Sequence, residues 1–107
     1  MPPLPFVLLL AAAPQCDPAQ GWQAGREGLA AARCEAGDYR EAHRLGQALH
    51  ELRQERAKLL QALPGTPAAQ QGALQRRVRQ LDVDLEAIRG VATIKGWPLD
   101  VAPEPVR

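Results

Sequence analysis

Apolar residues recur at steps of three and four along two long stretches of the chain. The first stretch carries Ala42, Leu45, Leu49, Leu52, Leu59 and Leu63, and the second carries Leu74, Val78, Leu81, Leu85, Ile88 and Ala92. This spacing puts the apolar side chains on one narrow stripe of a helix, which is typical of a coiled-coil seam. The segment Pro64-Gly65-Thr66-Pro67 separates the stretches, and its prolines interrupt both helices. The pattern predicts an all-α fold with an antiparallel helical hairpin over residues 38–95 and a turn at 64–67.

Folding at this turn predicts which positions meet. Three pairs come together along the hairpin: Leu63 with Gln70 or Gln71, Arg56 with Val78, and Leu49 with Leu85. Arg56 is the one charged residue in the seam. Its methylenes can cover the seam while its guanidinium reaches solvent or an acid such as Asp82. Alternatively, it is a polar residue that fixes the register of the pairing.

A weaker helix is predicted ahead of the hairpin, from Pro18 to Glu35 within a Gly- and Cys-containing segment at 16–37. Asp17 is suited to cap it and Pro18 to its first turn. Glycines inside it cost about 1 kcal/mol each relative to Ala, so the helix needs a packing partner. Because some of them share a stripe with Trp22, another helix can approach closely. We expect Gly37 to end this helix.

Capping residues also mark the starts of the two hairpin helices. Asp38 and Glu41 have the spacing of a capping box for the first. Thr66 is expected to cap the second, with Pro67 at its first helical position.

The two ends of the chain differ in character from its middle. Leu4–Ala13 is an uncharged apolar run, too short to span a bilayer but typical of the central region of a secretory signal. No Lys or Arg precedes it. We therefore predict a signal peptide at 1–15 and an exported protein. At the other end, residues 96–107 are expected to form a Pro-rich loose tail, with Trp97 folding back on the helices.

Cys16 and Cys34 leave several outcomes open. An even number of cysteines in an oxidising compartment favours a disulfide. If residues 18–33 were one unbroken helix, the two cysteines would lie roughly 25 Å apart, whereas a bridge needs Cα atoms within about 7 Å. Either the helix breaks near Gly25–Gly28, or the cysteines do not pair within one chain. The alternatives are lipidated Cys16, an interchain bridge and free thiols.

The charge balance and the motifs argue against several classes of function. With 13 Lys and Arg, 12 Asp and Glu and four aromatic residues, the chain has neither the basic excess nor the stacking rings of a nucleic-acid binder. It has no glycine-rich phosphate loop, nucleophile elbow or Cys-x-x-Cys motif. We therefore expect that the protein is not an enzyme and binds no cofactor. His43 and His50 lie roughly 10 Å apart along a helix, too far to chelate one metal ion. They are expected to be surface residues.

A set of landmarks resembles a family of uncharacterised small bacterial cell-envelope, lipoprotein-like proteins. The landmarks stand ahead of two Leu-heptad helices: Cys16, Trp22, Gly25, Gly28, Leu29, Cys34, Gly37, Tyr39 and Gly46. The chain departs from a lipoprotein at the attachment site. Lipid modification of a cysteine requires an aliphatic residue three positions before it and a small residue immediately before it, and for Cys16 these positions hold Ala13 and Gln15. The resemblance implies a cell-envelope location and assigns no catalytic residue.

These observations predict a non-catalytic exported envelope protein with a structural or adaptor role. The seam is apolar apart from Arg56 and carries no side chains suited to catalysis or ligand binding. We therefore expect a specific interaction surface ahead of it, at Trp22, Gly25, Gly28, Leu29 and Tyr39. A protein partner or self-association is expected, because the burial of about a dozen apolar side chains does not offset the cost of ordering about 70 residues. Membrane contact is expected only through the signal peptide or a lipid anchor. The alternative is a periplasmic metal or small-ligand binder that uses His43, His50 and a cysteine.

Overall fold

A computed structural model of the chain describes residues 16–99. In that part of the chain the elements are helices and one short turn of 3₁₀-helix, with no strand: α2 (Pro18–Arg26), α3 (Gly37–Ala62), η2 (Leu63–Gly65) and α4 (Ala68–Lys95). The predicted all-α class, a short helix followed by a long hairpin, is confirmed. No helix within residues 16–99 has the length and apolar composition needed to cross a membrane.

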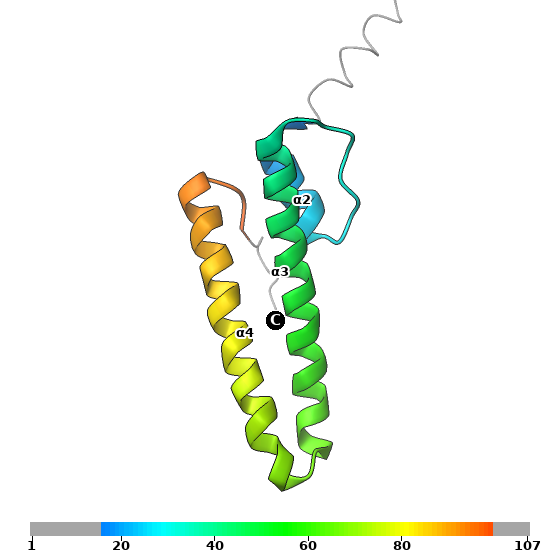
Figure 1. Cartoon of the computed structure of the whole chain (residues 1–107), viewed down its shortest axis with the longest axis vertical. Helices are drawn as coiled ribbons and strands as arrows, with labels where there is room; N and C mark the ends of the chain where they lie inside the picture. Colours follow the sequence, from blue (N-terminus) through cyan, green and yellow to red (C-terminus); the bar gives the residue numbers. More distant parts are fainter. Residues whose placement is uncertain (1–15, 100–107) are drawn as a thin grey trace, which may run out of the picture.

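α3 and α4 run antiparallel, side by side, and a tight turn joins them at one end of the molecule (Figure 1). At the turn, Gln71 Nε2 donates a hydrogen bond to the carbonyl of Leu63 at 3.4 Å. Farther along, Leu49 and Leu85 belong to one core cluster. The predicted pairing is therefore confirmed near the turn and at the end of the hairpin away from the turn.

Arg56 reaches across the hairpin to α4. Its Nε lies 2.6 Å from Oδ1 of Asp82, and both side chains are partly exposed. This contact confirms the interpretation in which the guanidinium leaves the seam for an acid at its edge. Whether Arg56 also fixes the register stays a prediction.

The helix starts agree with the sequence at α2 and differ at the other two helices. Asp17 caps α2, and its carboxylate accepts from the amide of Ala19 at 3.1 Å. The capping box at Asp38 is wrong, because α3 begins at Gly37 and no side chain caps it. Asp38 lies inside the first turn, where its carboxylate accepts from the amide of Tyr39.

α4 begins at Ala68, one residue later than expected, with Pro67 as its uncapped N-cap. The hydroxyl of Thr66 instead donates to the carbonyl of Ala62 at 2.8 Å. It thus satisfies a carbonyl at the end of α3, where helices leave such acceptors unpaired.

α2 is shorter than predicted because the chain turns at Gly28. The helix ends at Arg26, and Gly28 adopts a positive φ of 78°. The amide of Gly28 bonds to the carbonyl of Gly25, and the amide of Leu29 bonds to that of Ala24. These two bonds form a Schellman motif, in which glycine adopts the left-handed conformation at lowest cost. The predicted helix is therefore wrong beyond Arg26, and residues 27–36 form a loop that returns to α3.

The core lies where α2 packs against the end of the hairpin away from the turn. Trp22 is fully buried, Trp97 is 8% exposed, and their rings stack with centroids 5.4 Å apart. The other buried members of the cluster are Ala42, Leu49, Leu85 and Ala92. Trp97 follows Gly96, which ends α4 with a φ of 76° and directs the chain back. The expected return of Trp97 is confirmed, while its neighbours Gly96, Pro98 and Leu99 are exposed.

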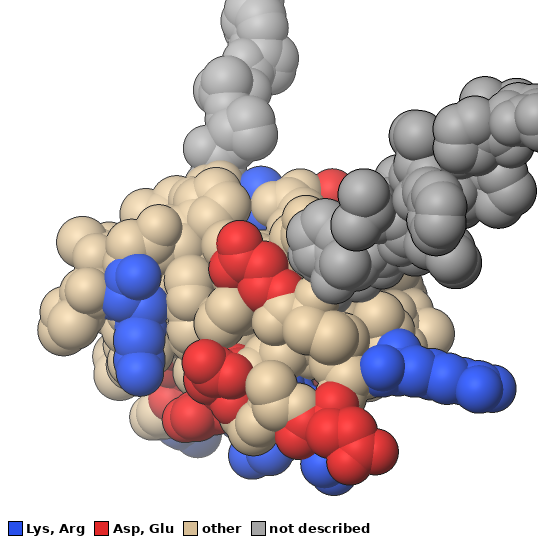
Figure 2. Space-filling view, turned by 90° about the horizontal axis from the view of Figure 1, so that it is seen from above, with Lys and Arg blue, Asp and Glu red and all other residues tan. Residues whose placement is uncertain are grey.

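Seen from the end that carries the core, acidic and basic side chains are interspersed on a largely uncharged surface (Figure 2). This end does not present a broad basic face. The predictions for residues 1–15 and for the rest of the tail, 100–107, lie outside the described part of the chain.

Candidate functional site

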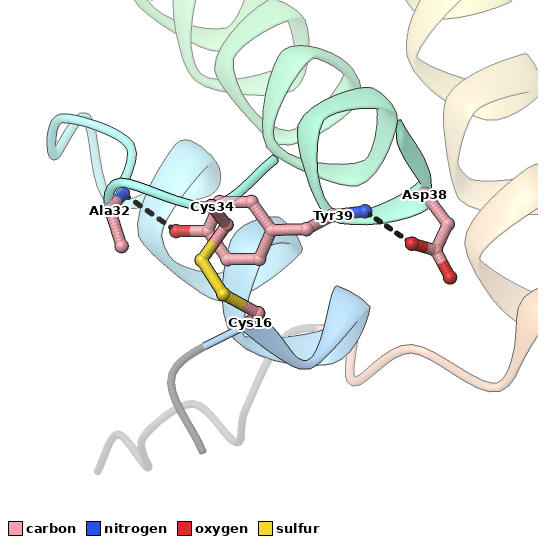
Figure 3. Close-up of a disulfide and its surroundings, with 5 residues drawn as sticks. All are labelled: Cys16, Ala32, Cys34, Asp38 and Tyr39. Atoms are coloured by element: carbon pink, nitrogen blue, oxygen red, sulfur yellow. Dashed lines mark hydrogen bonds between the residues drawn. A yellow bond between two sulfur atoms is a disulfide. The ribbon is translucent and has the colours of Figure 1, made fainter. Parts of the chain in front are cut away.

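The loop between α2 and α3 is tied to the start of α2 by a disulfide between Cys16 and Cys34, drawn in Figure 3. The two Cα atoms are 5.5 Å apart, within the range that a bridge requires. This pairing is compatible with the sequence because α2 ends at Arg26 and the loop runs back. Of the outcomes left open, the structure supports the intrachain bridge. Lipidation of Cys16 would need the same sulfur atom.

α2 and α3 cross with their backbones in contact. A Cβ atom added to Gly25 would lie 2.7 Å from the amide nitrogen of Gln47, and one added to Gly46 would lie 2.8 Å from that of Arg26. A Cβ on Gly21 would lie 2.6 Å from the carbonyl oxygen of Tyr39. Such separations leave no room for side chains, so the close approach predicted for the glycines of α2 is confirmed, with α3 as the partner helix.

Three side chains of α3 hold the loop and the end of α2 by their backbone. The hydroxyl of Tyr39 accepts from the amide of Ala32 at 2.9 Å (Figure 3). Nε2 of His43 bonds to the carbonyl of Leu29 at 2.8 Å, and Nδ1 of His50 bonds to that of Arg26 at 3.2 Å. A carbonyl can only accept, so each of these ring nitrogens carries the hydrogen.

The histidines are therefore not free surface residues. Both are half-buried, and they position the return of the chain. The sequence did not predict this role because the acceptors are backbone carbonyls, which every residue has and which therefore leave no signal in the residue types. The one available signal was that His43 and His50 share a helix face.

The five residues predicted as an interaction surface divide into two groups. Trp22, Gly25 and Tyr39 are buried between the chain's own elements. Gly28 and Leu29 are exposed, Leu29 by 56%. The predicted surface is therefore corrected: its larger residues are used internally, because α3 is the partner that the glycine stripe accommodates.

The groups named for metal binding are occupied in other ways. The disulfide uses both cysteines, which leaves no thiolate as a ligand. Within residues 16–99 no group of three or more His, Cys, Asp and Glu side chains comes together as a metal site would require.

The hairpin has one flank covered by α2 and one flank without such a cover. Gly46 and His50 face α2, whereas Leu45 and Leu52 lie on the other flank of the seam, since each residue turns the helix by about 100°. We call this flank the uncovered side, formed by the half-buried residues Leu45, Leu52, Ile88 and Val91. Among the described residues, no third helix covers this apolar flank.

An ion pair stands on the same flank, nearer the turn. Nε and Nη2 of Arg77 donate to the two carboxylate oxygens of Glu55 at 2.8 and 3.0 Å. This hydrogen bonding lowers the pKa of Glu55 and raises that of Arg77. Both side chains are more than 40% exposed, so the pair adds little to stability.

On the flank that α2 covers, a groove of about 450 Å³ continues toward the turn. Its walls mix three arginines with two acids and a few apolar residues: Arg53, Arg56, Arg89, Asp82, Glu86, Ala57, Leu60 and Leu85. The groove thus combines both signs of charge, unlike the apolar uncovered side.

No family model, curated protein or solved structure matches the chain. The arrangement of its own residues is therefore the basis for the function proposed below.

Proposed function

We propose that the protein is an exported, non-catalytic helical protein that works by binding another polypeptide through the uncovered side of its hairpin, with a second copy of the chain as the first partner. The observation that carries this proposal is the apolar flank itself. Two helices with a cover on one flank leave Leu45, Leu52, Ile88 and Val91 partly in contact with water. Two such hairpins placed face to face complete the core of a four-helix bundle.

Export is supported by two independent features. The apolar run Leu4–Ala13 suits a secretory signal. The disulfide between Cys16 and Cys34 is a bond that persists mainly in oxidising compartments such as the periplasm. The intact mass of the product made from the full chain, measured without reductant, tests this part. A product that keeps its first residues and two free thiols in a host competent for export contradicts it.

A non-catalytic role is supported by the partners of the histidines. His43 and His50 bond to backbone carbonyls rather than to carboxylates, so neither has the acid partner that orients and activates a general base. The surface that remains is suited to packing against a protein.

Sedimentation velocity of the disulfide-bonded protein over a wide concentration range tests the interaction. We expect a monomer–dimer equilibrium that Val91→Glu shifts to monomer, because the substitution places a charge in the apolar contact. Val83→Glu is the matched control, since Val83 is 61% exposed on the outer face of the same helix. A monomer at every concentration, or equal association of the wild type and Val91→Glu, contradicts binding to a second copy.

A further inference from the structure

A second hollow, of about 290 Å³, lies between the loop and the flank of α3 that faces away from α4. Ala31 lines it from the loop, and Arg40, His43, Arg44 and Gln47 line it from the helix. The four helical residues are spaced by three and four, so they share one face of α3. No acidic side chain lines the hollow. Its polar groups are those that donate hydrogen bonds to anions.

The loop wall of this hollow is fixed on both sides of Ala31. Before it, the carbonyl of Leu29 is bonded by His43. After it, the amide of Ala32 is bonded by the hydroxyl of Tyr39, and Cys34 is joined to Cys16. A wall held at three points needs little ordering when a ligand binds, which favours affinity.

The two arginines are available to a ligand. Neither guanidinium forms an ion pair or hydrogen bond with another residue of the described range 16–99. One further lining group can join them, the side-chain amide of Gln47, whereas His43 uses its Nε2–H for the carbonyl of Leu29. The carboxylate near this face is that of Glu51, which accepts from Gln47 Nε2 at 3.4 Å.

We propose that this hollow binds a phosphate group, held by the guanidinium groups of Arg40 and Arg44. Two guanidinium groups carry two positive charges, which match a phosphate dianion, and each offers a planar fork of donors that suits phosphate oxygens. The phosphate can belong to a small soluble molecule or to a lipid headgroup, since both present the same oxygens. This site is separate from the uncovered side, and its test is independent of the oligomeric state.

The test is a titration of the full, disulfide-bonded chain with inorganic phosphate, followed by amide shifts in two-dimensional NMR spectra. Sodium chloride at equal ionic strength is the reference, because it screens charge without filling the site. We expect saturable shifts centred on Arg40, His43, Arg44 and Gln47. Arg40→Gln and Arg44→Gln should each weaken binding about tenfold, as expected for the loss of a charge-assisted hydrogen bond.

Arg76→Gln is the matched control, since Arg76 is an exposed arginine of α4 outside the hollow and its loss removes the same charge. It should bind phosphate like the wild type. A second variant, Cys16→Ser with Cys34→Ser, should bind more weakly than the wild type while keeping its helical circular dichroism, because its loop wall loses one tether.

Vesicles of phosphatidylglycerol separate the two sources of the phosphate. Binding to the vesicles that both Arg→Gln variants lose identifies a lipid headgroup, and binding of free phosphate alone identifies a soluble ligand. The proposal is overturned if phosphate and chloride shift the same amides equally, or if the two arginine variants bind phosphate like the wild type.

Discussion

The two ends of the hairpin are built from the same kind of seam but are stabilised very differently. At the closed end, which comprises α2, the loop and the adjoining halves of α3 and α4, both tryptophans are buried and a disulfide joins the loop to α2. At the turn end, residues 53–82, α3 and α4 pack against each other, and no third helix of the described residues covers them. Val78 and Leu81 are buried there, while Leu59 and Leu74 are half-exposed.

This difference shows that a regular apolar repeat does not by itself make a deep core. Two helices bury one stripe each, and a third element is needed to close the other side of that stripe. α2 supplies this element at one end only. We therefore infer that the free energy of unfolding is concentrated at the closed end and that the turn end is the part of the hairpin that depends most on association.

The largest expected effect comes from removing the centre of the closed end. Trp22→Ala deletes a fully buried ring that stacks on Trp97 and donates from its indole to the carbonyl of Pro98. We expect a loss of about 3–5 kcal/mol in the free energy of unfolding, measured by urea denaturation. Leu60→Ala at the turn end, where the side chain is 44% exposed, should cost far less. Equal losses would contradict the contrast between the two ends.

Removal of the disulfide should rank second. Cys16→Ser with Cys34→Ser opens a loop of 18 residues, for which chain entropy gives a cost of about 3 kcal/mol. Amide hydrogen exchange should then rise first in α2 and in the loop, with α4 near the turn little changed. Faster exchange that is uniform over all helices would show that the two ends unfold together.

Replacing glycine by alanine should destabilise the protein where α2 crosses α3 and stabilise it in the middle of α4. Gly25→Ala places a Cβ against the backbone of α3, which cannot move cheaply, and we expect a loss of about 1–3 kcal/mol. Gly90→Ala, in the middle of α4 where a Cβ meets no atom within 4 Å, should gain about 1 kcal/mol from helix propensity. Thermal denaturation of the two variants and the wild type measures both effects. A stabilised Gly25→Ala protein would mean that α2 does not cross α3 so closely.

The smallest effect is expected from Glu55→Gln at the turn end. Arg77 lowers the pKa of Glu55 in the folded protein, so the pair stabilises the fold above the ordinary pKa of a glutamate, and this contribution is lost as the pH falls through the folded value. Because the pair is exposed, the variant should match the wild type at neutral pH within error. As the pH falls through the folded pKa of Glu55, the wild type should lose the small stabilisation from this ion pair, whereas the variant has none to lose. A large loss at neutral pH would mean that the turn end is more tightly packed than its exposure indicates.

The sequence predicted the hairpin well because its signals are local and repeated. The steps between Leu45, Leu49 and Leu52 fix a helix and its inner face, and the two prolines beside Gly65 fix the turn. The contact of Arg56 with Asp82 followed from the register alone.

The closed end was harder to predict because its determinants are nonlocal. The Gly28-Leu29 step carried a signal for the end of α2, but the continuing stripe to Ala32 favoured a longer helix, and contacts with α3 decided the outcome. The roles of His43 and His50 depend on backbone carbonyls brought near by that turn. A loop that must return to form a disulfide is specified by the whole arrangement and by no residue within it.

The stacked tryptophans have a spectroscopic consequence. Trp22 and Trp97 are the only tryptophans of the chain, and both lie at the closed end with their rings in contact. Intrinsic fluorescence is thus a local probe. It should change when the two indoles separate and should not respond to fraying of the helices near the turn. Far-ultraviolet circular dichroism, which averages over all helices, would register that fraying. Melting curves recorded by the two methods on the unlabelled protein would coincide only if the molecule unfolds in a single step.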